Sequence, residues 1–154
     1  MMKPNLPIIR LATEDDVAAI VALTDAAYRK FLPRLGRKPQ PMTTDYQQFI
    51  KQHSMWLLEI DQRLVGVLAL KHEIDSLLIY SVAIDPTEQK RGYGRLLLAH
   101  AEDEAKQAGY RSVRLYTNVL MEENIALYKR IGYQETRREV LSDRTIVHMS
   151  KQLF

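Results

Sequence analysis

The sequence predicts a mixed α/β fold, an α+β arrangement in which a mostly antiparallel sheet carries helices on both faces. Apolar segments typical of strands and segments of helical periodicity follow one another in the order β-α-α-β-β-β-α-β-α-β-β, which favours such a sheet. Hydrophobic residues make up 46% of the 154 residues, enough for one domain to bury a core without metals or disulfides. No repeat or linker divides the chain, so we expect a single domain over residues 1–154.

Periodicity and chain-breaking residues give the expected bounds of the elements. The strands are expected over residues 8–11, 56–60, 64–70, 76–84, 113–117, 133–140 and 145–153. The helices are expected to follow Thr13, to span residues 44–53, to run from residues 92–94 to Gly109, and to cover residues 122–131. The prolines and the glycine of residues 31–42 predict an irregular loop.

Capping signals mark the ends of these helices. Thr13 and Asp16 form the pattern of a capping box, and Thr44 is expected to cap the second helix. Gly109 and Gly132 match left-handed caps at helix ends. The buried faces are expected to include Val17, Ile20, Val21 and Tyr28 in the first helix, and Leu96, Leu97, Ala101 and Ala105 in the third.

Composition excludes several classes of site. The chain has no cysteine, so it has no disulfide, thiolate metal site or cysteine nucleophile, and its four histidines form no ligand pair that would predict a metal. No segment approaches about 20 apolar residues and the start lacks the apolar core of a secretory signal, so we expect a cytoplasmic protein without membrane contacts. The net charge of +3 is weak support for a nucleic-acid partner, which we do not expect. A homodimer stays open.

The segment most informative about chemistry runs from residue 82 to residue 95. A buried strand, Val82-Ala83-Ile84, breaks at Asp85-Pro86, and the chain re-enters a helix through Gln89-Lys90-Arg91-Gly92-Tyr93-Gly94-Arg95. Closely spaced glycines at a helix start can hold a pyrophosphate largely by backbone N–H groups. The alternative is a helix start with a glycine turn and solvated cations. A dinucleotide fingerprint is excluded because Leu97 stands where a third small residue is needed, and the Gly-Lys-Ser/Thr of a nucleotide triphosphatase is absent.

Two signatures in this sequence resemble those of the GNAT superfamily of N-acetyltransferases. Gln89-x-x-Gly92-x-Gly94 after the Val-Ala-Ile-Asp-Pro strand resembles its acetyl-CoA signature, and residues 124–133 resemble its late helix. The resemblance covers nearly the whole chain and implies a GNAT-like fold, acetyl-CoA as co-substrate and no metal. It also implies direct transfer, in a ternary complex, to a primary amine of a small molecule, an amino acid or a protein N-terminus. The alternative is a catalytically silent acyl-CoA-binding sensor or interaction module of the same fold.

The same resemblance implies roles for individual residues. The strand at Val82, Ala83 and Ile84 would splay from its neighbour and line the cofactor, with a backbone N–H near Val82 stabilising the oxyanion. Tyr128 would protonate the departing thiolate, although it can also be a packing residue. Met121 stands where the family more often has a CoA-contacting asparagine, so Asn118 or Asn124 is expected to serve the cofactor or to cap the late helix.

The acceptor side is less well defined. A general base must take a proton from the acceptor ammonium, and Glu73 is the main candidate, with His72 and Asp75 as neighbours that, like it, can be solvated hairpin residues. Tyr80 can also face the acceptor. The cations of the 31–42 loop predict an acidic group on the acceptor or, equally, a basic surface; they are Arg34, Arg37 and Lys38.

Overall fold

A seven-stranded sheet forms the centre of the protein. The structure, a computed structural model, describes residues 6–154. The strand order is β1-β2-β3-β4-β5-β7-β6, and neighbouring strands are antiparallel except for β4 and β5, which run parallel. The strands are β1 (Ile8–Leu11), β2 (Ser54–Ile60), β3 (Arg63–His72), β4 (Leu77–Ile84), β5 (Ser112–Asn118), β6 (Gln134–Val140) and β7 (Thr145–Gln152).

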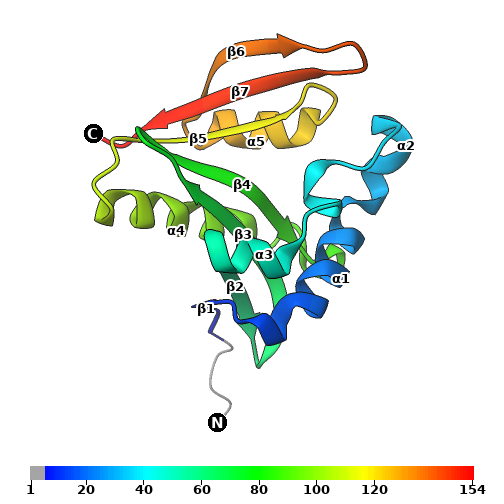
Figure 1. Cartoon of the computed structure of the whole chain (residues 1–154), viewed down its shortest axis with the longest axis vertical. Helices are drawn as coiled ribbons and strands as arrows, with labels where there is room; N and C mark the ends of the chain where they lie inside the picture. Colours follow the sequence, from blue (N-terminus) through cyan, green and yellow to red (C-terminus); the bar gives the residue numbers. More distant parts are fainter. Residues whose placement is uncertain (1–5) are drawn as a thin grey trace.

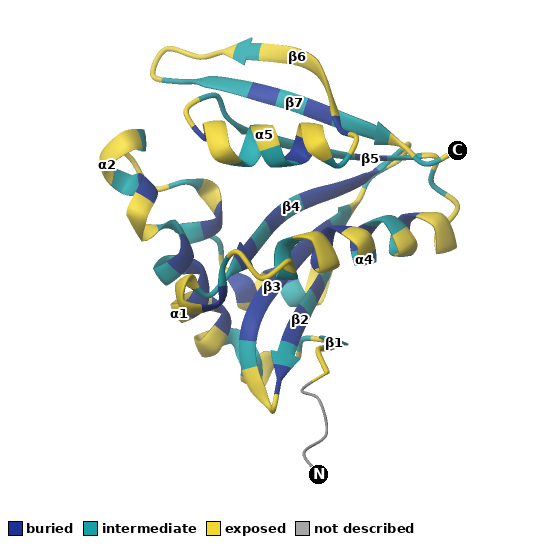
Figure 2. Ribbon diagram, turned by 180° about the vertical axis from the view of Figure 1, so that it is seen from behind, coloured by how far each residue is buried: buried dark blue, intermediate teal, exposed yellow. Residues whose placement is uncertain are grey.

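Helices cover both faces of this sheet, as predicted (Figure 1). The α-helices are α1 (Val17–Tyr28), α2 (Leu32–Leu35), α3 (Tyr46–Gln52), α4 (Tyr93–Gln107) and α5 (Glu122–Arg130). Residues of α1 and α3 share one buried cluster with the sheet, and residues of α4 and α5 share another on the opposite face. Figure 2 shows that the central strands are largely buried while β6, at the edge, is mostly exposed. No helix within residues 6–154 is long and apolar enough to cross a membrane.

The two parallel strands separate after a short common stretch. β4 pairs with β5 only from Leu77 to Ile79, and beyond this point the strands diverge (Figure 1). Tyr80 lies at the point of divergence as an extra residue, because Ile79 pairs with Leu70 of β3 while Ser81 pairs with Ala69. Such a bulge bends a strand and increases its twist. The splay that the family resemblance implied is therefore present, with its open end toward α1 and α2.

The segment of residues 31–42 is more regular than we predicted. It contains the single-turn helix α2 and a 3-10 turn, Gln40–Met42. Pro33 is tolerated in the first turn of α2, where its missing N–H would have no helical partner, and Gly36 ends α2 with a left-handed φ of 70°. The prolines therefore start short helical turns here.

Most helix caps agree with the sequence, but the second helix does not begin as expected. Asp16 Oδ2 accepts from the backbone N–H of Thr13 at 2.7 Å, which confirms the contact predicted for Asp16 in the capping box. In α3, Asp45 is the N-cap and accepts from the Gln48 N–H at 3.2 Å. Thr44 was predicted in that role, but its hydroxyl donates to the Gln40 carbonyl at 2.8 Å. The adjacent carboxylate is the competing, and better placed, acceptor.

The predicted buried faces are confirmed at Ile20 of α1 and at Leu97, Ala101 and Ala105 of α4, but each prediction also included one exposed residue. Val21 and Leu96 are exposed, at 40% and 37%, whereas Leu23 of α1 and Leu98 of α4 are buried. Each helix has consecutive apolar residues at these positions, so periodicity alone leaves the boundary of the buried stripe open. The hairpins are as predicted, and Asp61 and Gln62 both have positive φ, as the tight turn between β2 and β3 requires.

Candidate active site

Two cavities lie beside the splay of β4 and β5. The first, of about 530 Å³, is called the glycine-loop cavity because Gly92 and Gly94 line it. The second, of about 360 Å³, is called the tyrosine cavity because Tyr80 and Tyr116 line it. Tyr28, at the end of α1, lines both cavities, so they adjoin at this residue.

The structure brings most of the predicted cofactor residues together at the glycine-loop cavity. Those that line it are Val82, Ala83, Ile84, Gln89, Lys90, Gly92, Tyr93, Gly94, Arg95 and Asn124, together with the predicted acid Tyr128. Asn118 lines the tyrosine cavity instead, and its Oδ1 accepts from the Leu120 N–H at 2.9 Å. Of the two asparagines left open by the sequence, only Asn124 therefore lies at the glycine-loop cavity.

The glycine loop has the backbone geometry of an anion site. Gly92 is the N-cap of the 15-residue helix α4 and has a left-handed φ of 86°. A Cβ atom added at Gly92 or Gly94 would meet no atom of the described residues within 4 Å, so the backbone borders open space. The N–H groups of the first helical turn lack intrahelical partners, and the helix dipole adds partial positive charge. This end of α4 can therefore bind a phosphate.

One predicted cation of this loop is already engaged. Arg91 is not among the side chains that line the cavity; its Nη1 lies 3.3 Å from Oε2 of Glu88, a buried carboxylate. Arg63 Nη2 donates to the other oxygen of Glu88 at 2.7 Å. A buried carboxylate needs such partners, so Arg91 compensates Glu88 and supports the loop. Lys90 and Arg95 are the loop cations that line the cavity.

Tyr128 lies in the wall of the glycine-loop cavity, on α5. Its ring packs against Tyr133 with centroids 6.0 Å apart, so it also has the packing role that the sequence left open. Burial, with the nearby Tyr28 as a second cause, raises the pKa of the Tyr128 hydroxyl above its ordinary value of 10.0. The hydroxyl therefore stays protonated at neutral pH, as a proton donor must.

A short segment connects the two walls of the glycine-loop cavity. We call residues 29–35 the strap. Lys30 Nζ donates to Gln89 Oε1 at 2.9 Å, beside the glycine loop. Arg34 Nη1 donates to both oxygens of Glu123, at 2.8 and 2.9 Å, in the first turn of α5. Arg34, which we predicted beside the acceptor, is held at the cofactor side and is absent from the lining of the tyrosine cavity.

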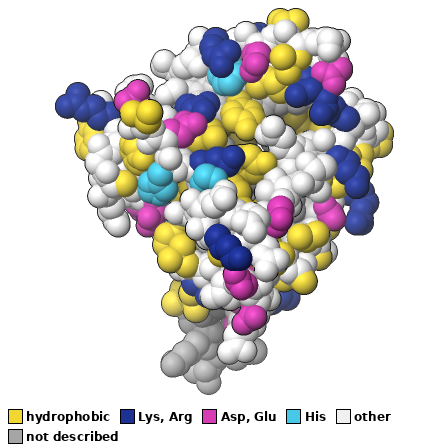
Figure 3. All heavy atoms as spheres, in the orientation of Figure 1, with side chains coloured by type: hydrophobic (Ala, Val, Ile, Leu, Met, Phe, Trp, Pro, Cys, Tyr) yellow, Lys and Arg dark blue, Asp and Glu magenta, His cyan; other side chains and the backbone are white. Residues whose placement is uncertain are grey.

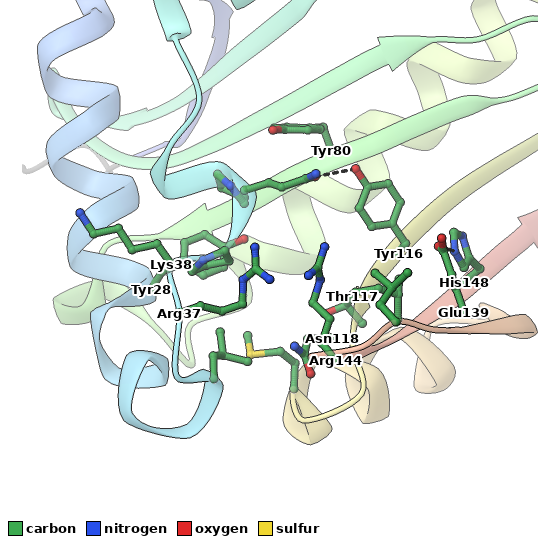
Figure 4. A pocket seen from close by; sticks show the side chains of 17 residues that line it. Tyr28, Arg37, Lys38, Tyr80, Tyr116, Thr117, Asn118, Glu139, Arg144 and His148 are labelled. Carbon is green, nitrogen blue, oxygen red and sulfur yellow. Dashed lines mark hydrogen bonds and ion pairs between the residues drawn. The ribbon is translucent and has the colours of Figure 1, made fainter.

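The tyrosine cavity lies on the face of the sheet that α1 and α3 cover. The Tyr80 hydroxyl is 2.7 Å from Thr44 Oγ1. The Tyr116 hydroxyl donates to Gln40 Oε1 at 2.8 Å, and Figure 4 shows Tyr80 and Tyr116 at the cavity. These contacts fix both rings across the splay, one on β4 and one on β5. On this face Figure 3 shows apolar side chains at the bottom of a hollow with Lys and Arg side chains around it.

Glu73, predicted as a catalytic base, lies outside the lining of both cavities. Arg114 of β5 holds it through two hydrogen bonds, from Nε at 2.5 Å and from Nη2 at 2.6 Å. The hydrogen bond from Arg114 is the main cause that lowers the pKa of Glu73, which disfavours proton uptake. Its neighbours His72 and Asp75 are also absent from both linings. We do not retain Glu73 as the base.

Several residues at the cavities were not identified from the sequence. Tyr28 was assigned only to the buried face of its helix, and nothing local marks it as a residue shared by two cavities. Glu139, Arg144 and His148 come from the last hairpin and line the tyrosine cavity. They reach it because β7 pairs with β5, which the sequence pattern does not specify. No cluster of three or more potential metal ligands occurs within residues 6–154.

Comparisons with known proteins agree with this arrangement. Over 78 residues the chain is 32% identical to ribosomal protein bS18-alanine N-acetyltransferase of Salmonella typhimurium, a stretch of 51% of this chain and 53% of that protein. The matched stretches span about half the length of such curated relatives.

Two solved structures share the fold at low identity. PaiA N-acetyltransferase from Thermoplasma acidophilum, in complex with coenzyme A, has a TM-score of 0.81 and 15% identity over 96% of this chain and 99% of that one. YncA from Salmonella typhimurium, with its cofactor acetyl-CoA, has a TM-score of 0.73 and 20% identity over 97% and 95%. The family model described as acetyltransferase (GNAT) family matches residues 18–133, well over half of the chain. The protein therefore belongs to the GNAT acetyltransferase family.

Proposed function

We propose that the protein transfers the acetyl group of acetyl-CoA to a primary amine of an acceptor, by direct attack in a ternary complex. The observation that carries this proposal is the junction of the two cavities at Tyr28, where β4 and β5 diverge. A cofactor in one cavity and an amine in the other would meet at this junction. The chain has no cysteine to carry the acetyl group, which favours direct transfer.

Acetyl-CoA is assigned to the glycine-loop cavity. Its pyrophosphate would lie at the first turn of α4, against Gly92 and Gly94, with Lys90 and Arg95 adding charge. Its pantetheine arm would then follow Val82, Ala83 and Ile84 toward the splay, where the pairing of β4 with β5 has ended. The related folds that hold coenzyme A and acetyl-CoA, PaiA and YncA, support this assignment.

The chemistry follows from the groups near the junction. The neutral amine attacks the thioester carbonyl, a C–N bond forms, and a backbone N–H of β4 near Val82 stabilises the oxyanion. The intermediate collapses, the C–S bond breaks, and Tyr128 donates its proton to the departing thiolate. The amine nitrogen releases its proton to solvent or to a base.

We also infer a cytoplasmic location, which cell fractionation would test.

Thiol release tests the reaction. Acetyl-CoA is mixed with the protein and with amines, amino acids or peptides that have a free N-terminus, and free CoA thiol and the acetylated product are both measured. The proposal expects thiol release that depends on the amine, with one acetyl group added per thiol. A silent acyl-CoA-binding module predicts that acetyl-CoA binds and that no amine in the panel causes release.

A further inference from the structure

The lining of the tyrosine cavity has two parts of different character, which we call its two ends. One end, at Tyr28 and Tyr80, lies at the splay and adjoins the glycine-loop cavity. The other end is formed by the loop that carries Arg37 and by the β6–β7 hairpin, which brings Arg144. If the proposed function holds, the acceptor amine occupies the first end. The rest of the acceptor then extends toward the second, charged end.

Two arginines at the charged end share a single carboxylate. Arg37 Nη1 donates to Asp143 Oδ2, and Arg144 Nη1 donates to Asp143 Oδ1 at 2.8 Å. Neither guanidinium donates another hydrogen bond to residues 6–154, so Nε and Nη2 of each remain available. Figure 4 shows the two guanidinium groups side by side and directed into the cavity. The Nε and Nη2 donors of Arg37 and Arg144 are therefore positioned at the cavity and have no acceptor within residues 6–154.

The balance of charge at this end is positive. Lys38 also lines the cavity and forms no ion pair with a described residue. The lining has one carboxylate, Glu139, and its Oε1 lies 3.1 Å from His148 Nε2. Three cations, Arg37, Lys38 and Arg144, therefore accompany two carboxylates, Asp143 and Glu139, and these five side chains have a net charge of +1.

The size of the cavity indicates a small acceptor. Its volume of about 360 Å³ is near the lower end of the range of roughly 300–1,000 Å³ for small-molecule sites. The contact between Arg37 and Asp143 joins the two walls at the charged end, one from the loop after α2 and one from the β6–β7 hairpin. A small molecule fits between these walls, whereas a peptide chain would have to continue past the contact.

We propose that the acceptor is a small primary amine that carries an anionic group, a carboxylate or a phosphate, bound by Arg37 and Arg144. A guanidinium presents two parallel N–H groups that match either anion, and such charge-assisted hydrogen bonds are among the stronger ones. This assignment rests on the proposed function for the position of the amine. The anion site itself rests only on the charges and donors of the cavity.

Matched pairs of amines test the proposal. One pair is 4-aminobutyrate and butylamine, and the other is 2-aminoethyl phosphate and ethanolamine; a peptide with a free N-terminus is assayed beside them. The anionic member of at least one pair should have a kcat/KM about tenfold or more above its neutral counterpart, as expected for hydrogen bonds to a charged group. Which pair shows the larger ratio distinguishes a carboxylate from a phosphate.

Variants of Arg37 and Arg144 test whether these residues cause the preference for an anionic amine. Arg37→Gln and Arg144→Gln should each raise the KM of the preferred anionic amine about tenfold, and should spare the KM of acetyl-CoA and of the neutral amine. Arg138→Gln is the matched control, because Arg138 lies on the same hairpin, pairs with Glu135 at 2.5 Å and is absent from the cavity lining. It removes the same charge from the same hairpin and should change none of these values.

A binding measurement separates this inference from the proposed function. CoA-loaded protein is titrated calorimetrically with 4-aminobutyrate and with 2-aminoethyl phosphate. If the wild-type protein binds one of these amines and Arg144→Gln does not, but no thiol release occurs, the anion site is retained and acetyl transfer is refuted. Efficient acetylation of butylamine, ethanolamine or the peptide without any preference for an anion would retain acetyl transfer and refute the anion site. An equal rise in the KM of the anionic amine in Arg138→Gln would also refute the anion site. If neither amine binds and no thiol is released, both the anion site and acetyl transfer are refuted.

Discussion

The two cavities are built in opposite ways. The glycine-loop cavity takes much of its lining from one contiguous stretch, residues 82–95, in which the backbone at Gly92 and Gly94 borders open space. The tyrosine cavity is lined by side chains from α1, the loop after α2, β4, β5 and the β6–β7 hairpin. We therefore expect the first cavity to be sensitive to backbone geometry and the second to side-chain identity. The acceptor can then change through substitutions that leave the cofactor site intact.

The largest effect is expected at the junction of the two cavities. Tyr128→Phe removes only the hydroxyl, so kcat should fall by about 100-fold to 10,000-fold while CoA affinity changes little. Kinetics under conditions where chemistry limits the rate, together with CoA titration, measure both. Tyr133→Phe is the matched control, because the Tyr133 hydroxyl is buried beside Tyr128, has no hydrogen-bond partner among residues 6–154 and should have no role in the chemistry. A near wild-type kcat for Tyr128→Phe would assign the residue to packing alone.

A backbone change should weaken only the glycine-loop cavity. Gly92→Val places a β-branched residue at a φ of 86°, against the open space assigned to phosphate, and should reduce CoA affinity by about 100-fold or more. Gly109→Val at the other end of α4 is the control, because Gly109 has the same φ of 86° and also borders open space. Both variants carry similar strain, so thermal melts should agree while calorimetry with CoA differs. Unchanged affinity in Gly92→Val would rule out this phosphate site.

A change remote from both cavities should affect stability alone. Arg10 donates to Asp16, and this hydrogen bond is the main cause that lowers the pKa of Asp16 from 3.8 to about 2. A depressed pKa stabilises the folded state fully above about pH 4, and the contribution is lost as the pH falls toward 2. Asp16→Asn should therefore lower the free energy of unfolding by about 1–2 kcal/mol at pH 7, and the difference from wild type should shrink at acid pH.

Urea titrations of both proteins at pH 7 and pH 3 measure this difference. The KM values for acetyl-CoA and for the acceptor should not change in Asp16→Asn. A pH-independent difference in stability would contradict the ionic origin of the effect. A change in either KM would show that the contact between Arg10 and Asp16 is coupled to the cavities.

The smallest effect is expected at Glu73. Loss of a general base typically costs 100-fold or more, but Glu73 is held by Arg114 outside both cavities, so Glu73→Gln should change kcat by less than about threefold. The pH dependence of kcat should keep its shape. A fall of 100-fold with a shifted acid limb would return Glu73 to the mechanism.

Local signals predicted more of this protein than non-local ones. The glycine loop and Tyr128 could be predicted to share a site because each belongs to a contiguous motif that resembles the GNAT family, and both line the glycine-loop cavity. Glu73 could not be judged, because Arg114 lies 41 residues further along the chain, in a strand whose register is set by tertiary pairing. The same applies to Arg34, whose partner Glu123 is 89 residues away. The predicted cap of α3 was wrong for a different reason. Thr44 and Asp45 are adjacent residues that can both accept, and the local pattern does not choose between them.

The strap connects the two cavities along the chain. It contacts Gln89 and Glu123 on opposite walls of one cavity, and the chain continues from it directly into the Arg37 loop of the other. Binding free energies around a closed cycle must balance. The factor by which coenzyme A changes the dissociation constant of the acceptor must therefore equal the factor by which the acceptor changes that of coenzyme A. A measurement of cooperativity from either side gives its value for both.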